Sequence, residues 1–315
     1  MRQPPYQLRP NKAVDRLTLI DAIRQFRDAH DLREYTYYGM GGPWLEDFRL
    51  IYDFYPEIRM VSIESDENVY RRQQFHIPCH RVRLDLKRTE FNSFLASFGP
   101  EAGKSIFWLD YLWLRYAHID EFMTLLGKVP ADSMIKISLR CEPKDYLEDK
   151  KRKEFQREFE DVLPHPSVEP PVSFADLAKL VQEMIQIAAQ KALSSAMPFK
   201  FVPVSSFCYA DGAGMFTLTG IVCRRTDESK VKSAFRSWDL RNLSWGTPRL
   251  IDVPTLSTKE RLHLQRQLPR GNNAGRTLLH ALGYLIEDDR PQTEARLQQY
   301  ADFHHYFPYF MKAIP

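Results

Sequence analysis

Short β-prone runs alternate with helical repeats five times along the first half of the chain, and this alternation constrains the fold more than any other feature. The runs are rich in β-branched and aromatic residues, and each is too short to be a helix. Strands that are separated by single helices of about ten residues form a parallel sheet with helices on both faces. The expected strands are residues 35–38, 59–63, 81–84, 105–109 and 133–139.

Two longer alternating runs close this pattern, at residues 201–209 and 215–223. Asp211 and Gly212 lie between them, and Asp-Gly between β-prone runs is a strong signal for a hairpin. The two runs therefore add an antiparallel pair to the parallel strands. The fold class expected from the whole pattern is α/β, with a mostly parallel seven-stranded sheet that ends in an antiparallel hairpin.

Periodicity and composition divide the chain into regions. An apolar stripe at helical spacing precedes the first strand, a densely charged and then proline-rich stretch follows the fifth, and a capped helix and an aromatic tail come after the hairpin. The expected regions are residues 1–34, an N-terminal helical segment; residues 35–236, the main domain, with 144–172 as a charged insertion and linker; and residues 237–315, a small C-terminal helical appendage.

Composition excludes some classes of protein. Hydrophobic residues make up 43% and charged residues 27% of the chain, which is typical of a folded globular protein and not of a disordered one. Lys and Arg exceed Asp and Glu by only three residues, so the overall charge does not indicate a nucleic-acid-binding protein. A local basic cluster at residues 224–241 is interpreted as a solvated surface segment.

The cysteines Cys79, Cys141, Cys208 and Cys223 lie far apart and form no CxxC pair. No metal site is expected, because their spacing does not suit zinc. We interpret them as reduced, mostly buried thiols of a cytoplasmic protein. No membrane association is expected either, since no stretch approaches the roughly 18 uninterrupted apolar residues of a membrane span.

The order of five parallel strand–helix units followed by an antiparallel hairpin resembles the class I S-adenosylmethionine-dependent methyltransferase superfamily. The resemblance covers about residues 35–225 and depends on motif positions. It implies a Rossmann-like sheet, S-adenosylmethionine as the cofactor, and transfer of a methyl group to an oxygen or nitrogen acceptor. The acceptor is left open among an RNA ribose, a protein and a small molecule, and no oligomeric state is predicted.

The turn after the first strand carries the residues expected to hold the cofactor. Gly39, Gly41 and Gly42 let the backbone turn tightly and approach a ligand without a Cβ in the way. Open α/β sheets bind nucleotides at this end of their strands. The resemblance places the turn, including Met40, beneath the methionine part of the cofactor, and a purely structural glycine turn is the alternative.

Acidic residues follow the next two strands. Glu64 ends the second strand, where a carboxylate can accept hydrogen bonds from ribose hydroxyls. Alternatively, Glu64 favours a helix N-terminus, a role that Asp66 could equally fill. The resemblance implies that Asp85, after the third strand, meets the adenine amino group and that Leu86 contacts the ring, whereas the alternative for Asp85 is a surface aspartate.

Asp110 and Lys136 are the candidate catalytic residues. Asp110 ends the most apolar strand, where it could contact the cofactor and orient or deprotonate the acceptor; alternatively, it hydrogen-bonds the neighbouring loop. Lys136 lies in the middle of the apolar fifth strand, where an unpartnered lysine is costly to bury. RNA ribose 2′-O methyltransferases are similar in pairing an aspartate after the fourth strand with a lysine in the fifth. For Lys136, a side chain that reaches solvent from a strand end is the alternative.

Departures from these families leave a second function open. Tyr37 stands where many class I enzymes carry an acid, and residues 215–223 contain no glutamate, which the 2′-O enzymes carry there. Tyr37 could face the sulfonium of the cofactor or pack in the core. A catalytically inactive binding or scaffold module is therefore the alternative to an enzyme. A NAD-dependent dehydrogenase is disfavoured, because its sheet continues with a parallel sixth strand instead of a hairpin.

Overall fold

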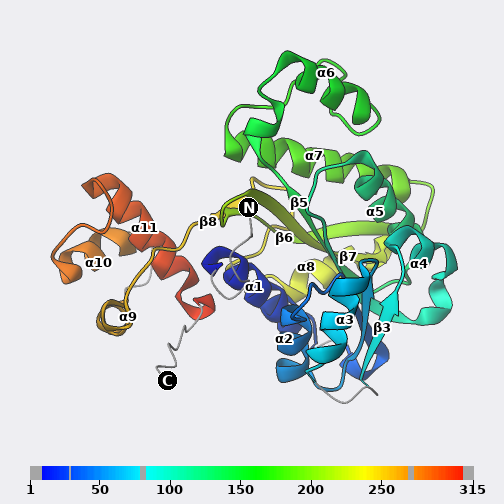
Figure 1. The fold of residues 1–315 in the computed structure, drawn as a ribbon, viewed down its shortest axis with the longest axis horizontal. Helices are drawn as coiled ribbons and strands as arrows, with labels where there is room; N and C mark the ends of the chain where they lie inside the picture. The colour runs from blue at the N-terminus through cyan, green and yellow to red at the C-terminus, as the bar shows by residue number, and fades with distance from the viewer. Residues whose placement is uncertain (1–8, 28–29, 79–82, 269–272, 308–315) are drawn as a thin grey trace. The chain divides into compact units, whose positions relative to one another are not determined.

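One mixed sheet of eight strands has the order β3-β2-β1-β4-β5-β7-β6-β8 (Figure 1). The computed structural model describes residues 9–27, 30–78, 83–268 and 273–307. The parallel strands are β1 (Tyr35–Gly39), β2 (Arg59–Glu64), β3 (Leu84–Arg88), β4 (Lys104–Asp110) and β5 (Ser133–Arg140). The sheet is completed by β6 (Phe199–Ala210), β7 (Gly214–Arg224), which runs antiparallel to β5, and β8 (Arg249–Ile251). The predicted mostly parallel sheet with its hairpin is confirmed, with an eighth strand added.

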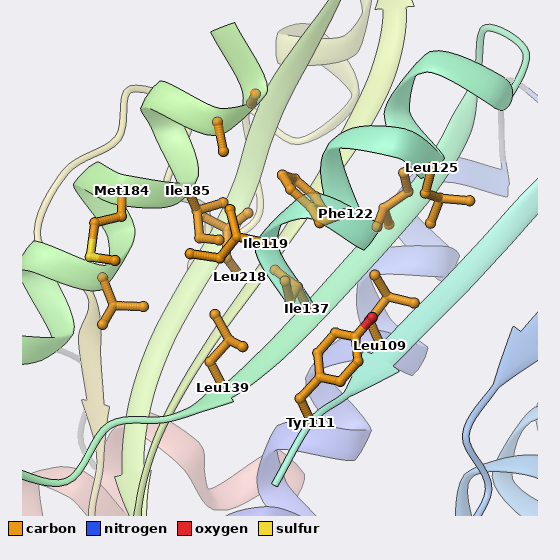
Figure 2. Packing of buried hydrophobic residues seen from close by; sticks show 14 of the residues in the cluster. Leu109, Tyr111, Ile119, Phe122, Leu125, Ile137, Leu139, Met184, Ile185 and Leu218 are labelled. Atoms are coloured by element: carbon orange, nitrogen blue, oxygen red, sulfur yellow. The ribbon is translucent and has the colours of Figure 1, made fainter. Parts of the chain in front are cut away.

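Helices cover one face of the sheet, namely α4 (Phe91–Ser97), α5 (Tyr116–Lys128) and α7 (Phe174–Ala192). The alternate residues Ile135, Ile137 and Leu139 of β5 are fully buried on this face, because successive side chains of a strand point to opposite faces. Figure 2 shows Phe122 of α5 and Ile185 of α7 in the same apolar cluster. This cluster is the main hydrophobic core of the described residues.

The other face carries α2 (Glu46–Phe54) and α3 (Glu67–Phe75). Phe48 of α2 is fully buried and packs edge-on against Tyr37 of β1, with 5.1 Å between the ring centroids. The predicted arrangement of helices on both faces is therefore confirmed. Further helices are α1 (Pro10–Arg27), α6 (Asp149–Glu158) and α8 (Glu228–Ala234), and short 3-10 helices span Leu32–Glu34, Pro100–Ala102, Pro143–Tyr146, Arg225–Asp227 and His304–Tyr306.

The charged segment after β5 is more than an exposed helix and linker. Phe155, on α6, and Phe159, which follows it, are both buried within the main core cluster. Their rings lie 4.8 Å apart. Because charged residues dominate this segment, its sequence did not predict that these two rings pack into the main core cluster.

The predicted bounds of the third strand are wrong. The strand was expected at residues 81–84 with Asp85 at its end, but β3 begins at Leu84 and ends at Arg88. Residues 79–82 lie outside the described ranges. Because β3 is at the edge of the sheet and mostly exposed, it lacks the apolar run that marks a central strand.

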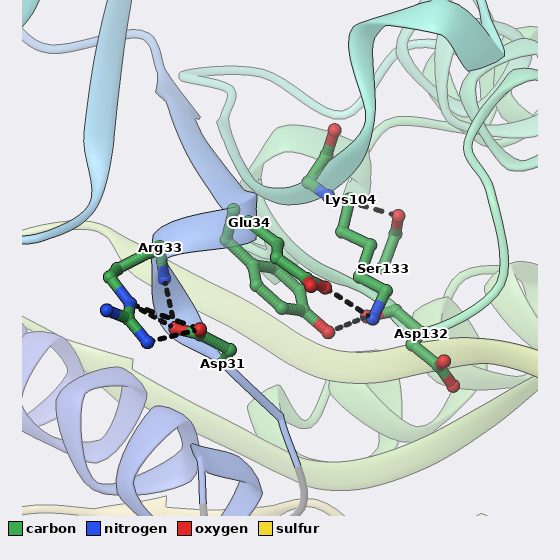
Figure 3. Close-up of polar contacts among 8 residues, drawn as sticks. Asp31, Arg33, Glu34, Lys104, Asp132 and Ser133 are labelled. Atoms are coloured by element: carbon green, nitrogen blue, oxygen red, sulfur yellow. Dashed lines mark hydrogen bonds and ion pairs between the residues drawn. The ribbon is translucent and has the colours of Figure 1, made fainter.

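Polar pairs close the edge of the sheet at which β1, β4 and β5 begin (Figure 3). Lys104 Nζ lies 3.0 Å from Glu34 Oε2, and the Tyr35 hydroxyl donates a hydrogen bond of 3.1 Å to the carbonyl oxygen of Asp132. Ser133 Oγ accepts a hydrogen bond from the N–H of Ser105, at 3.2 Å. The polar groups at this edge are therefore paired with one another within the protein.

The chain divides into two units, of which one comprises Leu19–Cys208 and Ala213–Arg249 and the other comprises Met1–Thr18, Tyr209–Gly212 and Leu250–Pro315. The second unit contains α9 (Thr258–Gln265), α10 (Ala274–Leu282) and α11 (Arg290–Phe303). A Cβ on Gly275 of α10 would stand 2.0 Å from the Glu294 carbonyl oxygen of α11, so these helices cross in close contact. The expected helical C-terminal end is confirmed.

The other global expectations concern membranes and cysteines. Within the described ranges, no helix has the length and apolar character needed to cross a membrane. Cys141, Cys208 and Cys223 are buried thiols, as expected, and burial raises the pKa of Cys208 and of Cys223 to about 11. Cys79 lies outside the described residues.

Candidate cofactor site

Two carboxylates flank the glycine turn at the carboxyl edge of the sheet. Gly39, the last residue of β1, is opposite Ser62 on β2 and opposite Trp108 on β4. Glu64 and Asp110 end those neighbouring strands, each two residues beyond its partner of Gly39. Since β1 continues to β2 on one side while β4 lies on its other side, the winding direction of the sheet reverses here, which is where open α/β sheets bind nucleotides.

Close packing is what requires glycine in the turn. A Cβ on Gly41 would stand 2.2 Å from Cε2 of Phe48, far inside van der Waals contact. The turn itself is tight, because the N–H of Gly42 donates a hydrogen bond of 2.9 Å to the carbonyl oxygen of Met40. Met40 is partly buried and packs against the main core cluster. The turn therefore packs closely against Phe48 of α2 and, through Met40, against the main core cluster.

An acid reaches the turn from α2 instead of from β1. Tyr37 is fully buried, and its hydroxyl donates a hydrogen bond of 2.5 Å to Oδ2 of Asp47. The same Asp47 oxygen would lie 3.0 Å from a Cβ on Gly39. Tyr37 therefore packs in the core, as one of its two interpretations held, and Asp47 brings a carboxylate to the turn although β1 has none.

Glu64 and Asp66 have separate tasks. Asp66 is the N-cap of α3, where Oδ1 accepts hydrogen bonds from the N–H groups of Asn68 and Val69 at 2.8 and 2.9 Å. Glu64 is half-buried, and its Oε1 accepts a hydrogen bond of 2.8 Å from the N–H of Asp66. Burial raises the pKa of the Glu64 carboxyl above its ordinary value, and the hydrogen bond from Asp66 acts in the opposite direction. The capping role thus belongs to Asp66 and not to Glu64, and ribose binding by Glu64 stays a prediction.

The expected position of Asp85 at the carboxyl edge is wrong. Asp85 is the second residue of β3, is exposed, and forms an ion pair of 2.7 Å with Lys87. Arg88 is the residue of β3 that lies opposite Glu64. Leu86 is half-buried opposite Ser62, nearer the middle of the strand. Neither residue lies at the end of β3, so their contact with adenine stays a prediction that the strand register does not support.

A polar ladder fixes the strand ends around Asp110. Asp110 is half-buried and lies opposite Ser138 of β5. The indole N–H of Trp108 donates a hydrogen bond of 2.9 Å to Ser138 Oγ, which in turn donates one of 3.3 Å to Thr217 Oγ1. The N–H of Tyr111 also bonds the carbonyl oxygen of Ser138, at 3.0 Å. The backbone on both sides of the Asp110 carboxylate is therefore rigidly placed.

Lys136 lies on the same face of the sheet as Asp110, but it is two residues farther from the carboxyl edge, opposite Trp108 instead of Asp110. It is opposite Trp108 on β4 and Thr219 on β7, and its Nζ lies 4.9 Å from the Trp108 ring centroid. Its side chain is 0% exposed, so the interpretation of a lysine that reaches solvent from a strand end is wrong. Full burial also does not favour direct contact with an acceptor, and a catalytic role for Lys136 stays a prediction.

Apolar side chains at the rim of the site were not predicted. Leu112 and Trp113 follow β4 and are 58% and 54% exposed. The guanidinium of Arg140, at the end of β5, lies 4.9 Å from a Trp113 ring centroid and is held by two hydrogen bonds to Asp145. The only sequence signal was the apolar pair itself, directly after the candidate aspartate.

Comparisons with known proteins give a family for the chain. A family model described as "Putative O-methyltransferase" matches residues 4–315. No curated protein matches the sequence.

Solved structures with similar folds include a probable spermidine synthase from Corynebacterium glutamicum, with 15% identity, coverage of 78% of this chain and 82% of that one, and a TM-score of 0.45. P. horikoshii TYW2 in complex with MeSAdo is similar at 12% identity, with 65% and 62% coverage and a TM-score of 0.36. The chain thus spans less than two thirds of that protein. M. jannaschii TYW2 in complex with AdoMet is similar at 9% identity, with coverage of 65% of this chain and 75% of that one and a TM-score of 0.40. Because the family model matches almost the whole chain, the protein belongs to this O-methyltransferase family.

Proposed function

We propose that the protein methylates a hydroxyl oxygen at the carboxyl edge of the sheet, with S-adenosylmethionine bound across the turn of residues 39–42. The observation that carries this proposal is the register that places Glu64 and Asp110 on either side of Gly39. When bound, the cofactor supplies an already activated methyl group, so the protein has mainly to position the reactants.

The residues present fit such a cofactor. Glu64 has a second carboxylate oxygen beside the one that accepts from Asp66, and a carboxylate suits the hydroxyl groups of a ribose. Asp47 brings negative charge to the turn, which suits the cationic methionine part. Gly42 is partly exposed and has no side chain, so a ligand could contact the backbone of the turn there.

Asp110 is proposed to act on the acceptor. Its carboxylate lies at the end of β4, across from the ribose side of the turn, and would orient the acceptor hydroxyl and take up its proton as the methyl group transfers. The exposed Leu112 and Trp113 next to it would form one wall for the acceptor. An RNA ribose, a protein hydroxyl and a small molecule all remain candidate acceptors.

Labelling tests the proposal and sorts the acceptors. The protein is incubated with S-adenosylmethionine that carries a radioactive methyl group and with an extract of the cells that produce it. The extract is then separated into RNA, protein and low-mass fractions. Base-resistant label in one fraction identifies the acceptor class. Calorimetric binding of the cofactor without label in any fraction would instead support the alternative, an inactive binding or scaffold module.

Replacing Glu64 with glutamine is expected to weaken S-adenosylmethionine binding about 10- to 100-fold, because hydrogen bonds to a charged group contribute about 1.5–3 kcal/mol. Burial disfavours the ionised form of Glu64, so the variant should fold at least as stably as the wild type at neutral pH. Calorimetry measures the affinity. Glu67→Gln, on the exposed first turn of α3, is the matched control and should bind normally.

The affinity is also expected to depend on pH through Glu64. Its pKa is raised by burial, and the ionised form is the one that accepts both ribose hydroxyls. As the pH falls through this raised pKa, binding should therefore weaken, by up to about tenfold per pH unit well below it. Glu64→Gln should remove this dependence. An unchanged pH profile in the variant would mean that another group titrates.

We also propose that the protein is cytoplasmic. Cys141, Cys208 and Cys223 are free thiols, which suits a reducing compartment such as the cytoplasm. Apart from the cofactor, the partner implied by the site is the methyl acceptor.

A further inference from the structure

A buried amide on α3 holds the glycine turn. Gln73 is 0% exposed, and its Nε2 donates hydrogen bonds to the carbonyl oxygens of Gly41 and Gly42, at 2.8 and 3.3 Å. Its Oε1 accepts a hydrogen bond of 3.1 Å from the hydroxyl of Ser62 on β2. Both ends of this amide are therefore satisfied, and it ties the turn to the neighbouring strand.

The same helix holds the next part of the turn. The Arg72 guanidinium lies 4.8 Å from the Trp44 ring centroid. Arg49 of α2 donates to the carbonyl oxygen of Trp44 at 3.2 Å and to that of His76, at the end of α3, at 2.9 Å. At the other end of α3, the N–H of Asp66 bonds Glu64. Residues 66–76 thus contact both the turn and the carboxylate that flanks it.

We propose that α3 is a rigid bracket for the cofactor site and that Gln73 is its central positioning residue. The inference depends on the proposed function, because it assigns to Gln73 the task of setting the backbone of residues 41–45 relative to Glu64. Loss of the amide removes the side-chain donor to the buried carbonyl oxygen of Gly41 and one of two donors to that of Gly42, which also accepts from the N–H of Leu45. A buried carbonyl oxygen without a donor favours rearrangement toward water. The turn then samples other conformations, and cofactor binding must select the competent one.

The test compares Gln73→Leu with Gln74→Leu, which makes the same chemical change at an exposed position of the same helix. Hydrogen exchange of the peptide that covers residues 40–45, measured without ligand, should be faster by about tenfold or more in Gln73→Leu and unchanged in Gln74→Leu. Calorimetry should show about tenfold weaker S-adenosylmethionine binding in Gln73→Leu alone. With an acceptor identified by labelling, the KM for S-adenosylmethionine should rise while kcat stays within about threefold.

Ser62→Ala provides a second variant. It removes only the hydrogen bond to Gln73 Oε1, so it should speed hydrogen exchange and weaken S-adenosylmethionine binding less than Gln73→Leu does. If Gln73→Leu lacks a cooperative thermal transition, Ser62→Ala replaces it in the test. Equal exchange in Gln73→Leu and Gln74→Leu would overturn the bracket. Faster exchange with unchanged affinity would overturn its role in cofactor positioning. Wild-type protein that does not bind S-adenosylmethionine would overturn the proposed function, whereas the exchange result would still test whether Gln73 holds the turn.

Discussion

Asp110→Asn is expected to reduce methyl transfer about 10²- to 10⁴-fold, the range over which a positioned proton acceptor contributes to a reaction. Asparagine keeps the size of the side chain but cannot take up the acceptor proton. The hydrogen bonds around Ser138 hold the strand ends on both sides, so the site should keep its shape. The dissociation constant for S-adenosylmethionine should stay within about threefold. Initial rates of label transfer into the responsive fraction, together with calorimetry, measure both quantities.

Asp132→Asn is the matched control for this prediction. Asp132 lies at the opposite edge of the sheet, before β5 (Figure 3), and its backbone has a positive φ of 68°, which asparagine tolerates. Its replacement should leave transfer unchanged. If Asp110→Asn retained wild-type rates, Asp110 would not act on the acceptor, and catalysis would depend on positioning alone.

The sequence predicted the central part of the fold because buried strands carry their own signal. β1, β2, β4 and β5 are apolar runs that end in a glycine or a polar residue, and their order along the chain is enough to predict parallel pairing. The edge strands lack this signal. β3 is mostly exposed and β8 has three residues, so one was misplaced and the other missed.

The candidate site divides in the same way. Glu64 and Asp110 could be predicted because a residue that ends a strand has a known place at the sheet edge. Asp47 and Gln73 could not be predicted, because both lie on helices. Which residues they contact depends on how α2 and α3 pack against the sheet. Nothing local distinguishes buried Gln73 from exposed Gln74, its neighbour in the chain.

Lys136 was the most unusual residue in the sequence, and the structure shows two features of its environment. Burial of a lysine requires a compensating environment, and here the aromatic face of Trp108 lies 4.9 Å from its ammonium group. Thr219 lies opposite it on β7. The sequence pattern correctly marked a residue that is costly to bury, and the strand register with its full burial shows that Lys136 lies deeper in the sheet than Asp110.

Gly41→Ala is expected to disrupt both folding stability and cofactor binding. The added methyl group would stand 2.2 Å from Phe48 Cε2, and Phe48 cannot easily withdraw, because it is fully buried and packs on Tyr37, whose hydroxyl is bound to Asp47. Overpacking of this kind costs about 1–3 kcal/mol. The midpoint of thermal unfolding should therefore fall by about 2 °C or more for each kcal/mol.

The larger effect of Gly41→Ala should be on the ligand. To relieve the contact the turn must shift by roughly 1 Å, and a displacement of that size in a positioning element can cost about 10²-fold in function. Gly127→Ala, on an exposed part of α5 where a Cβ meets nothing within 4 Å, is the matched control, and it should stabilise the protein by up to about 1 kcal/mol without changing affinity. If both alanine variants bound S-adenosylmethionine like the wild type, the turn at Gly41 would be a packing feature of the sheet and the ligand would have to bind elsewhere.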